Sequence, residues 1–189
     1  MIKRILFLQS SRIKSTFSTK KSNPSISTMS GTSSSSSAPS PSLPAYSFTE
    51  RIGTGSYGSV YKAHLKTGSR DVVAIKCIKK SGLAKHEVDN IVNEISLLKK
   101  LKHPHIVVMK DFAWDANYIY IIMDYCGGGD LSQFIRKRSQ LSEQTVKLFL
   151  QQLAVALRYL RENNVSHMDL KPQNILLTSG LATNSTLLF

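Results

Sequence analysis

The eight residues from His167 to Asn174 constrain this chain more than any other stretch. They read His-Met-Asp-Leu-Lys-Pro-Gln-Asn, and the apolar run Ile175-Leu176-Leu177 follows them. Asp169 can accept a proton, Lys171 can neutralise a phosphate, and Asn174 can ligate Mg²⁺. A capped turn before a strand would also suit some of these residues, but polar side chains at these fixed offsets are hard to obtain by chance. The segment therefore predicts a loop that handles phosphate.

A glycine-rich segment precedes this loop by more than a hundred residues. It reads Gly53-Thr54-Gly55-Ser56-Tyr57-Gly58, and glycines let a backbone approach phosphate closely. The same pattern occurs in dinucleotide-binding oxidoreductases, but there a helix follows the last glycine directly. Here the strand-like run Ser59-Val60-Tyr61-Lys62-Ala63 follows. This favours a glycine loop between two antiparallel strands and argues against an oxidoreductase.

Lys76 ends the apolar run Val73-Ala74-Ile75. An ammonium on a rigid strand can reach the α- and β-phosphates of a nucleotide. Glu94, eighteen residues on in a predicted helix, could hold that ammonium in place, and Glu87, nearer the helix start, is a weaker partner. The plain alternatives are a surface lysine and a solvated helix glutamate.

Periodicity predicts an α+β fold with an antiparallel five-stranded sheet. Ser142 is expected to cap the last helix, and Asn163 and Asn164 are expected to end it. The predicted strands span 46–52, 59–66, 71–78, 106–111 and 118–124, and the predicted helices span 85–101, 131–137 and 142–161.

Together these motifs resemble the protein kinase family over residues 46 to about 178, and Lys171-Pro172 resembles its serine/threonine branch. Further segments resemble the ULK group of autophagy-linked kinases, nearest its third member. Those segments are Ser166 to Leu177, Lys110-Asp111-Phe112-Ala113-Trp114-Asp115, Ile122-Met123-Asp124-Tyr125-Cys126 and Gly128-Gly129-Asp130-Leu131-Ser132.

The resemblance implies a serine/threonine kinase that transfers the γ-phosphate of ATP to protein hydroxyls with the help of Mg²⁺. Its fold would be a five-stranded N-lobe with one helix, followed by the beginning of a helical C-lobe. The catalytic residues would be Asp169, Lys171, Lys76 and Glu94, and Asn174 would hold the metal. The nucleotide would contact Ile52, Gly53, Gly55, Gly58, Val60, Ala74, Lys76, Met123, Asp124, Cys126, Asp130 and Leu176.

Within that nucleotide site the family gives each position a role. The adenine ring would lie between Val60, Ala74 and Leu176, with Met123 behind it. The backbones of Asp124 and Cys126 would bind adenine, and Asp130 would lie near the ribose. Leu98 and His167 would belong to the packed spine between the lobes. Ordinary core packing would account equally well for Val60, Ala74, Leu98 and Leu176.

Two departures from the family stand out. Met168 stands where most kinases carry an arginine that pairs with an activation-loop phosphate, which bears on regulation and not on the chemistry. No aspartate follows Asp169, although the family's Asp-Phe-Gly, which binds Mg²⁺, is expected near Leu187. We therefore expect a kinase domain over 46–189 that is truncated before Asp-Phe-Gly and has little or no activity. The alternative is a non-catalytic module that binds nucleotide, or binds a partner on the uncovered helix Ser142–Arg161. The exposed apolar face of that helix is predicted to carry Val146, Phe149, Leu150, Leu153, Leu157 and Leu160.

Composition adds expectations about the rest of the chain. Residues 1–45 hold most of the prolines, many serines and no acid, which predicts a disordered, basic tail. Its start resembles a mitochondrial leader, but a plain disordered leader is favoured. The net charge of +13 suits phosphate ligands or a solvated surface, and no basic ridge interleaved with aromatics suggests nucleic-acid binding. Two isolated cysteines and no membrane-spanning run favour the cytoplasm.

Overall fold

The computed structural model describes residues 3–4, 40–55, 58–138, 140–178 and 187–188. Most of the predicted tail, and residues 56–57 of the glycine turn, lie outside the described residues. At the start of the chain, Lys3–Arg4 form β1, which pairs in parallel with β7 (Val165–Ser166). No sequence pattern predicted this contact.

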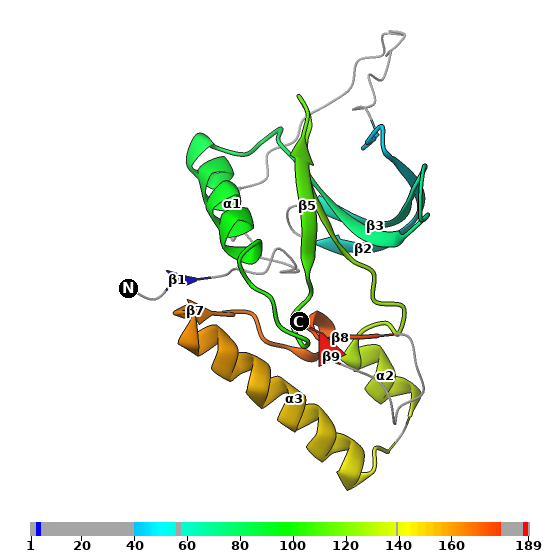
Figure 1. Ribbon diagram of the computed structural model, residues 1–189, viewed down its shortest axis with the longest axis vertical. Coiled ribbons are helices and arrows are strands. Elements are labelled where there is room, and N and C mark those ends of the chain that lie inside the picture. Colours follow the sequence, from blue (N-terminus) through cyan, green and yellow to red (C-terminus); the bar gives the residue numbers. More distant parts are fainter. Residues whose placement is uncertain (1–2, 5–39, 56–57, 139, 179–186, 189) are drawn as a thin grey trace, which may run out of the picture.

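Five antiparallel strands form the upper part of the molecule, which confirms the predicted sheet (Figure 1). The strand β4 lies at its centre, and its interior residues from Val73 to Ile78 are all buried. Apart from Lys76 this stretch is apolar, as suits a strand that is covered on both faces. In spatial order the strands are β2 (Tyr46–Gly55), β3 (Gly58–Leu65), β4 (Val72–Lys79), β6 (Tyr118–Asp124) and β5 (Met109–Trp114).

Two predicted boundaries around Pro104 were wrong. The helix expected to reach Leu101 ends at Leu98, and the strand expected over 106–111 begins only at Met109. Between them Ile106 donates its N–H to the carbonyl of His103 at 3.1 Å, closing a turn around Pro104. Leu101 and Ile106 belong to this loop, and their side chains are buried. Their apolar character therefore marks burial in the core, not membership of a helix or strand.

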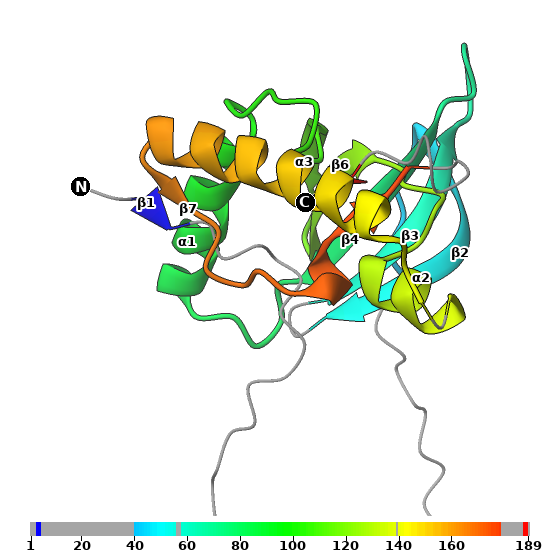
Figure 2. The same ribbon diagram turned by 90° about the horizontal axis from the view of Figure 1, so that it is seen from below.

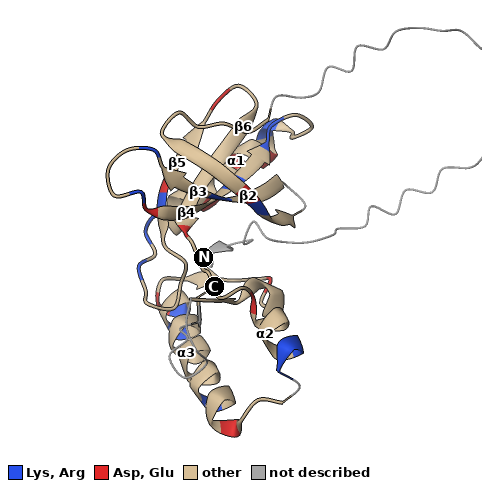
Figure 3. Ribbon diagram, turned by 90° about the vertical axis from the view of Figure 1, so that its right-hand side faces the viewer, with Lys and Arg blue, Asp and Glu red and all other residues tan. Residues whose placement is uncertain are grey.

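Helices complete the two-lobed arrangement that Figure 3 shows, with the sheet above and two helices below. On the upper lobe, α1 (Lys85–Leu98) packs its buried face against the sheet. The lower helices are α2 (Leu131–Lys137) and α3 (Glu143–Glu162), and Figure 2 shows α3 running from α2 at one end to β7 at the other. As predicted, the Ser142 hydroxyl caps α3 by accepting the N–H of Thr145 at 3.2 Å, and Asn164 takes a left-handed backbone after it.

The end of the described chain forms a short hairpin below the sheet. A 3-10 turn, η1 (Pro172–Asn174), leads into β8 (Leu176–Leu177), which pairs antiparallel with β9 (Leu187–Leu188). Leu177 joins Leu160 and Val165 in the core cluster that also holds the buried face of α1. The two lobes therefore share one apolar core. None of the described helices is long and apolar enough to cross a bilayer.

Candidate functional site

A cleft of about 610 Å³ lies where the sheet meets the segment that joins β6 to α2. All but one of the residues predicted to bind nucleotide line this cleft, and so does the predicted metal ligand Asn174. The nucleotide residues in the lining are Ile52, Gly53, Gly55, Val60, Ala74, Lys76, Met123, Asp124, Cys126, Asp130 and Leu176.

Gly58 is the exception, and a different constraint explains its identity. A Cβ atom at Gly58 would overlap the backbone carbonyl of Cys77 on the neighbouring strand β4. By contrast, a Cβ at Gly53 would meet the Cβ of Val60 at 3.7 Å, an ordinary contact. Glycine is therefore required at Gly58 by the close approach of β3 to β4, and its contact with phosphate stays a prediction.

Lys76 is the most buried cation of the site. Its side chain is 2% exposed and lines the cleft, and Nζ has no hydrogen-bond partner among the described residues. Burial lowers the pKa of Lys76 to about 7, although the charge of Glu94 opposes this. An ammonium without a partner is costly to bury. The cleft is therefore electrostatically incomplete without an anion.

Glu94 faces Lys76 from α1 without bonding to it. Burial raises the pKa of Glu94 to about 7, and the charge of Lys76 works in the opposite direction. Its Oε1 also has no hydrogen-bond partner among the described residues, and no ion pair joins the two side chains there. The predicted partnership is therefore electrostatic in this structure. Glu87, the weaker candidate, instead accepts the N–H of Ala84 at the start of α1.

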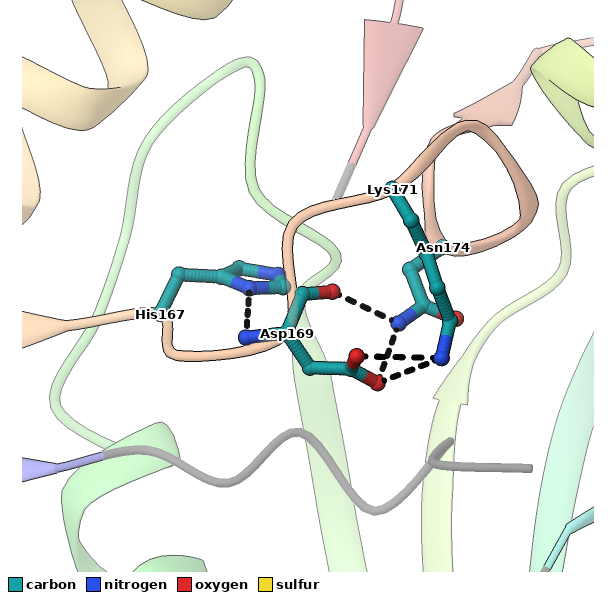
Figure 4. Close-up of polar contacts among 4 residues, drawn as sticks. All are labelled: His167, Asp169, Lys171 and Asn174. Carbon is teal, nitrogen blue, oxygen red and sulfur yellow. Dashed lines mark hydrogen bonds and ion pairs between the residues drawn. The ribbon is translucent and has the colours of Figure 1, made fainter. Parts of the chain in front are cut away.

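Asp169 is the centre of a polar cluster, and Figure 4 shows Lys171 and Asn174 both directed at it. Lys171 Nζ lies 3.0 and 2.9 Å from the two carboxylate oxygens, and Asn174 Nδ2 lies 2.7 Å from Oδ2. Burial works to raise the pKa of Asp169, but the hydrogen bonds from Lys171 and Asn174 outweigh it and keep that pKa below its usual value. The carboxylate is therefore ionised and fixed in orientation.

The backbone before Asp169 makes a tight turn. Met168 has a φ of 59°, in the left-handed region that a non-glycine residue rarely adopts. The turn lets the Asp169 N–H donate to the carbonyl of His167 at 2.8 Å, and it also lies 3.3 Å from Nδ1 of the same residue. His167 is buried. The position of Asp169 is therefore set by a buried neighbour.

The segment between β6 and α2 is joined to β8 across the floor of the cleft. Gly128 donates its N–H to the carbonyl of Leu177, and Leu177 donates to that of Gly129, both at 2.9 Å. A Cβ at Gly128 would lie 2.5 Å from the carbonyl oxygen of Thr178. Glycine is therefore needed here for close backbone packing.

Two acids at the edge of the cleft already have partners. Asp130, predicted near a ribose, caps α2 by accepting the N–H of Gln133 at 2.8 Å. Asp124 Oδ1 lies 3.2 Å from Nζ of Lys110 on β5. The side chain of Asp124 is therefore occupied by this ion pair, whereas the predicted contact with adenine involves only its backbone.

The described residues offer a metal only part of a ligand set. They contain no group of three or more His, Cys, Asp or Glu side chains that could hold an ion. The Nδ2 of Asn174 donates to Asp169. The other amide atom of Asn174, Oδ1, is the one that could ligate a metal at the cleft. Mg²⁺ is normally bound by carboxylates together with substrate phosphates. The described residues thus supply only part of the ligand set that Mg²⁺ requires.

Some residues of the cleft were not predicted as nucleotide contacts. The 167–174 motif assigns a role to Asn174 and none to its neighbour Gln173. Val107 and Met109 fall in a segment that the sequence predicts only as a strand. Together with Gln133 they line the cleft. The spacing of the 167–174 segment could have suggested Gln173, but no local pattern pointed to the others.

Known proteins share this arrangement of fold and site. Residues 46–183 match the family model described as protein kinase domain. Serine/threonine-protein kinase ULK3 of Homo sapiens is 55% identical over 139 residues, which cover 74% of this chain and 29% of that protein. Serine/threonine-protein kinase ULK1 of Homo sapiens is 44% identical over 134 residues, which cover 71% of this chain and 13% of that protein.

A solved structure agrees with these relatives. The crystal structure of Rad53 1-466 in complex with AMP-PNP superimposes with a TM-score of 0.67 at 30% identity, covering 76% of this chain and 38% of that one. The chain spans less than a third of the length of the ULK3 and ULK1 relatives it matches. The predicted resemblance to the ULK group is confirmed by the similarity to both. The chain belongs to the protein kinase family, and the relatives named here are serine/threonine-protein kinases.

Proposed function

We propose that the cleft binds ATP and serves a kinase that phosphorylates serine and threonine hydroxyls of proteins. The observation that carries this proposal is the buried Lys76 ammonium, which lines the cleft and has no hydrogen-bond partner among the described residues. A triphosphate would supply the missing negative charge. The opposite wall holds Asn174, which is bonded to Asp169.

Asp169 is the proposed base for the attacking hydroxyl. Its lowered pKa keeps it ionised at neutral pH, as a proton acceptor must be. Lys171 touches both carboxylate oxygens and brings positive charge to the place where the γ-phosphate would react. A divalent ion bound with the nucleotide would neutralise phosphate charge, and Asn174 Oδ1 is the atom of this chain proposed to hold it.

The adenine end of the cleft is proposed to lie against the segment after β6. Val60, Ala74 and Leu176 would hold the ring between apolar surfaces, and Met123 would close its rear. Backbone groups of Asp124 and Cys126 would bind its polar edge. Support comes from the fact that all six residues line the one cleft.

Nucleotide titration tests the proposal. ATP should raise the melting temperature of the chain, and Lys76→Met should remove that shift because the phosphate loses its buried cation. Lys79→Met, an exposed lysine at the end of the same strand, is the matched control and should respond as the unmodified chain does. An equal ATP response in the Lys76→Met variant would contradict this site.

An exposed apolar surface on α3 favours a second function, in which the chain is a non-catalytic module that binds a partner. Val146 and Leu150 of α3 are 39% and 58% exposed. Phe149 and Leu160, predicted to share that uncovered face, are buried instead. If the chain is such a module, it should show little or no phosphotransfer with Mg-ATP, whereas turnover that Asp169→Asn abolishes would favour the enzyme.

We also propose that the chain works in the cytoplasm. Cys77 and Cys126 are both free thiols, which supports a reducing compartment. Fluorescent tagging of the chain in cells tests this location, and an organelle signal that disappears when residues 1–28 are removed would favour a leader instead.

A further inference from the structure

The chain just before β2 crosses the outer face of the sheet, on the side away from α1 (Figure 1). We call residues 40–45 the strap. Leu43 of the strap packs against an apolar cluster on this face, and the carbonyl of Ala45 accepts the N–H of Lys66, just after β3, at 3.0 Å. The buried members of this outer cluster are Ala63, Val73, Ile75, Cys77, Tyr120 and Ile122. The strap therefore helps to cover the apolar side chains on this face.

Tyr120 anchors the strap from within the sheet. Its side chain is buried, and its hydroxyl accepts the backbone N–H of Ser42 at 3.2 Å. The same hydroxyl donates to Oδ2 of Asp115 at 2.6 Å, while Oδ1 of Asp115 accepts the N–H groups of Asn117 and Tyr118, both at 2.7 Å. Because a hydroxyl can donate and accept at once, its bond to Asp115 leaves a lone pair for Ser42. One side chain therefore ties the strap to the turn between β5 and β6.

The outer cluster lies directly behind one wall of the cleft, because successive residues of a strand point to opposite faces of a sheet. The residues of β4 and β6 that line the cleft are Ala74, Lys76, Ile121 and Met123. Their neighbours in the outer cluster are Val73, Ile75, Cys77, Tyr120 and Ile122. Ile121, the residue after Tyr120, lies opposite Lys76 in the strand register. No residue of the strap lines the cleft, so the strap can act on this wall only from its rear.

We infer that the strap, anchored by Tyr120, positions the cleft wall formed by β4 and β6. The inference rests on the proposed ATP site, since its effect is measured there. When the strap is detached, the outer cluster loses part of its cover, and β4 and β6 open locally more often. Lys76 and Ile121 are then in place for a smaller part of the time. Apparent nucleotide affinity falls in proportion to the fraction of molecules that are competent to bind.

Tyr120→Phe tests the anchor by removing one oxygen atom. It keeps the ring in the outer cluster but removes the acceptor for the Ser42 N–H and the donor to Asp115. We expect faster hydrogen exchange at the Lys66 amide, which is bonded to the strap, and at the amides of residues 74–77. We also expect ATP affinity to weaken roughly three- to tenfold, the range typical of residues that influence a site without touching its ligand.

Leu43→Ala loosens the strap without altering any residue of the sheet. Because Leu43 is only partly buried, this variant should fold, and it should change exchange and ATP affinity in the same direction as Tyr120→Phe. Tyr61→Phe is the matched control. Tyr61 packs against the same outer cluster, and its hydroxyl has no hydrogen bond to a described residue, so its loss should change neither measurement.

ATP affinity decides the inference where the unmodified chain binds ATP. If either Tyr120→Phe or Leu43→Ala then binds ATP as tightly as the unmodified chain, the strap is only a cover and the inference is wrong, even if exchange at Lys66 is faster. If the unmodified chain binds no ATP, the proposed function fails. The exchange of residues 74–77 then decides the strap by itself, with faster exchange in both variants supporting it and unchanged exchange in either overturning it.

Discussion

Asn174 donates its side-chain amide twice to Asp169, to the carboxylate oxygen Oδ2 at 2.7 Å and to the backbone carbonyl at 2.8 Å. One buried side chain thus holds both the charge and the backbone of the proposed base. Its remaining amide oxygen is the atom proposed to meet a metal. The geometry of Asp169 is therefore prepared before any nucleotide arrives.

Replacing Asn174 by alanine should release Asp169. With one of its hydrogen bonds gone, the pKa of the Asp169 carboxyl should rise toward its usual value, because the charged form loses support. The free energy of unfolding should fall by about 1 kcal/mol. Carboxyl NMR titration and urea unfolding measure the two effects. Asn90→Ala, on the exposed side of α1, serves as the control, and an unchanged Asp169 pKa in Asn174→Ala would refute this role.

Lys76→Met should stabilise the nucleotide-free chain at pH 6. The pKa of Lys76 in the folded chain is lowered to about 7, while the unfolded chain titrates near 10.5. The folded state therefore bears the full cost of the buried charge below pH 7, and loses that cost as pH rises from 7 to 10.5. The gain should be on the order of 1 kcal/mol at pH 6 and should shrink by pH 9.

Chemical unfolding at both pH values measures the effect of Lys76→Met. The exposed Lys79→Met variant should show no such trend. A loss of stability in Lys76→Met at pH 6 would mean that Lys76 has a partner in solution, contrary to its environment here.

Gly128→Ala should destabilise the segment between β6 and α2. Its new methyl group would meet the Thr178 carbonyl at 2.5 Å, so the pairing with β8 must shift. We expect a loss of about 2 kcal/mol in the free energy of unfolding, typical of overpacking against backbone. Gly53→Ala, whose methyl group has room, should retain the fold. Equal stability of the two variants in urea would argue against the close approach.

Two leucines of α3 should behave oppositely. Leu160 is 2% exposed, and Leu160→Ala should cost about 2–5 kcal/mol because it leaves a cavity in the shared core. Leu150 is 58% exposed, and Leu150→Ala should change stability by less than about 0.5 kcal/mol. Thermal unfolding compares them directly. A large loss in Leu150→Ala would show that this side of α3 is covered in solution.

Much of the fold followed from local patterns. The apolar residues of β4 predicted a strand at this place, and Ser142 predicted the start of α3. The cleft residues could be predicted because the resemblance to the protein kinase family gives each of these positions a role. The strand over 106–111 was misplaced because Ile106 lies in a turn but is buried. In a sequence, a buried apolar loop residue cannot be told from a strand residue.

Other features depend on contacts between distant segments. The stacking of Tyr159 on His103 joins residues 56 positions apart, and no pattern in the sequence around either residue predicts it. The same holds for β1, because the sequence offers no pattern that predicts the pairing of Lys3 and Arg4 with β7. Likewise, Phe149 is buried and Leu150 is exposed, although the helical periodicity predicted that both lie on one face. Tertiary packing decided these cases.

Hydrogen exchange with and without AMP-PNP tests most directly whether the two walls of the cleft bind one nucleotide. Saturating AMP-PNP should slow amide exchange both in β4 around Lys76 and in residues 167–177, because both line or support the cleft. Lys76→Met should lose the protection in both places. Protection confined to one of these segments, or none in either, would contradict a shared triphosphate site.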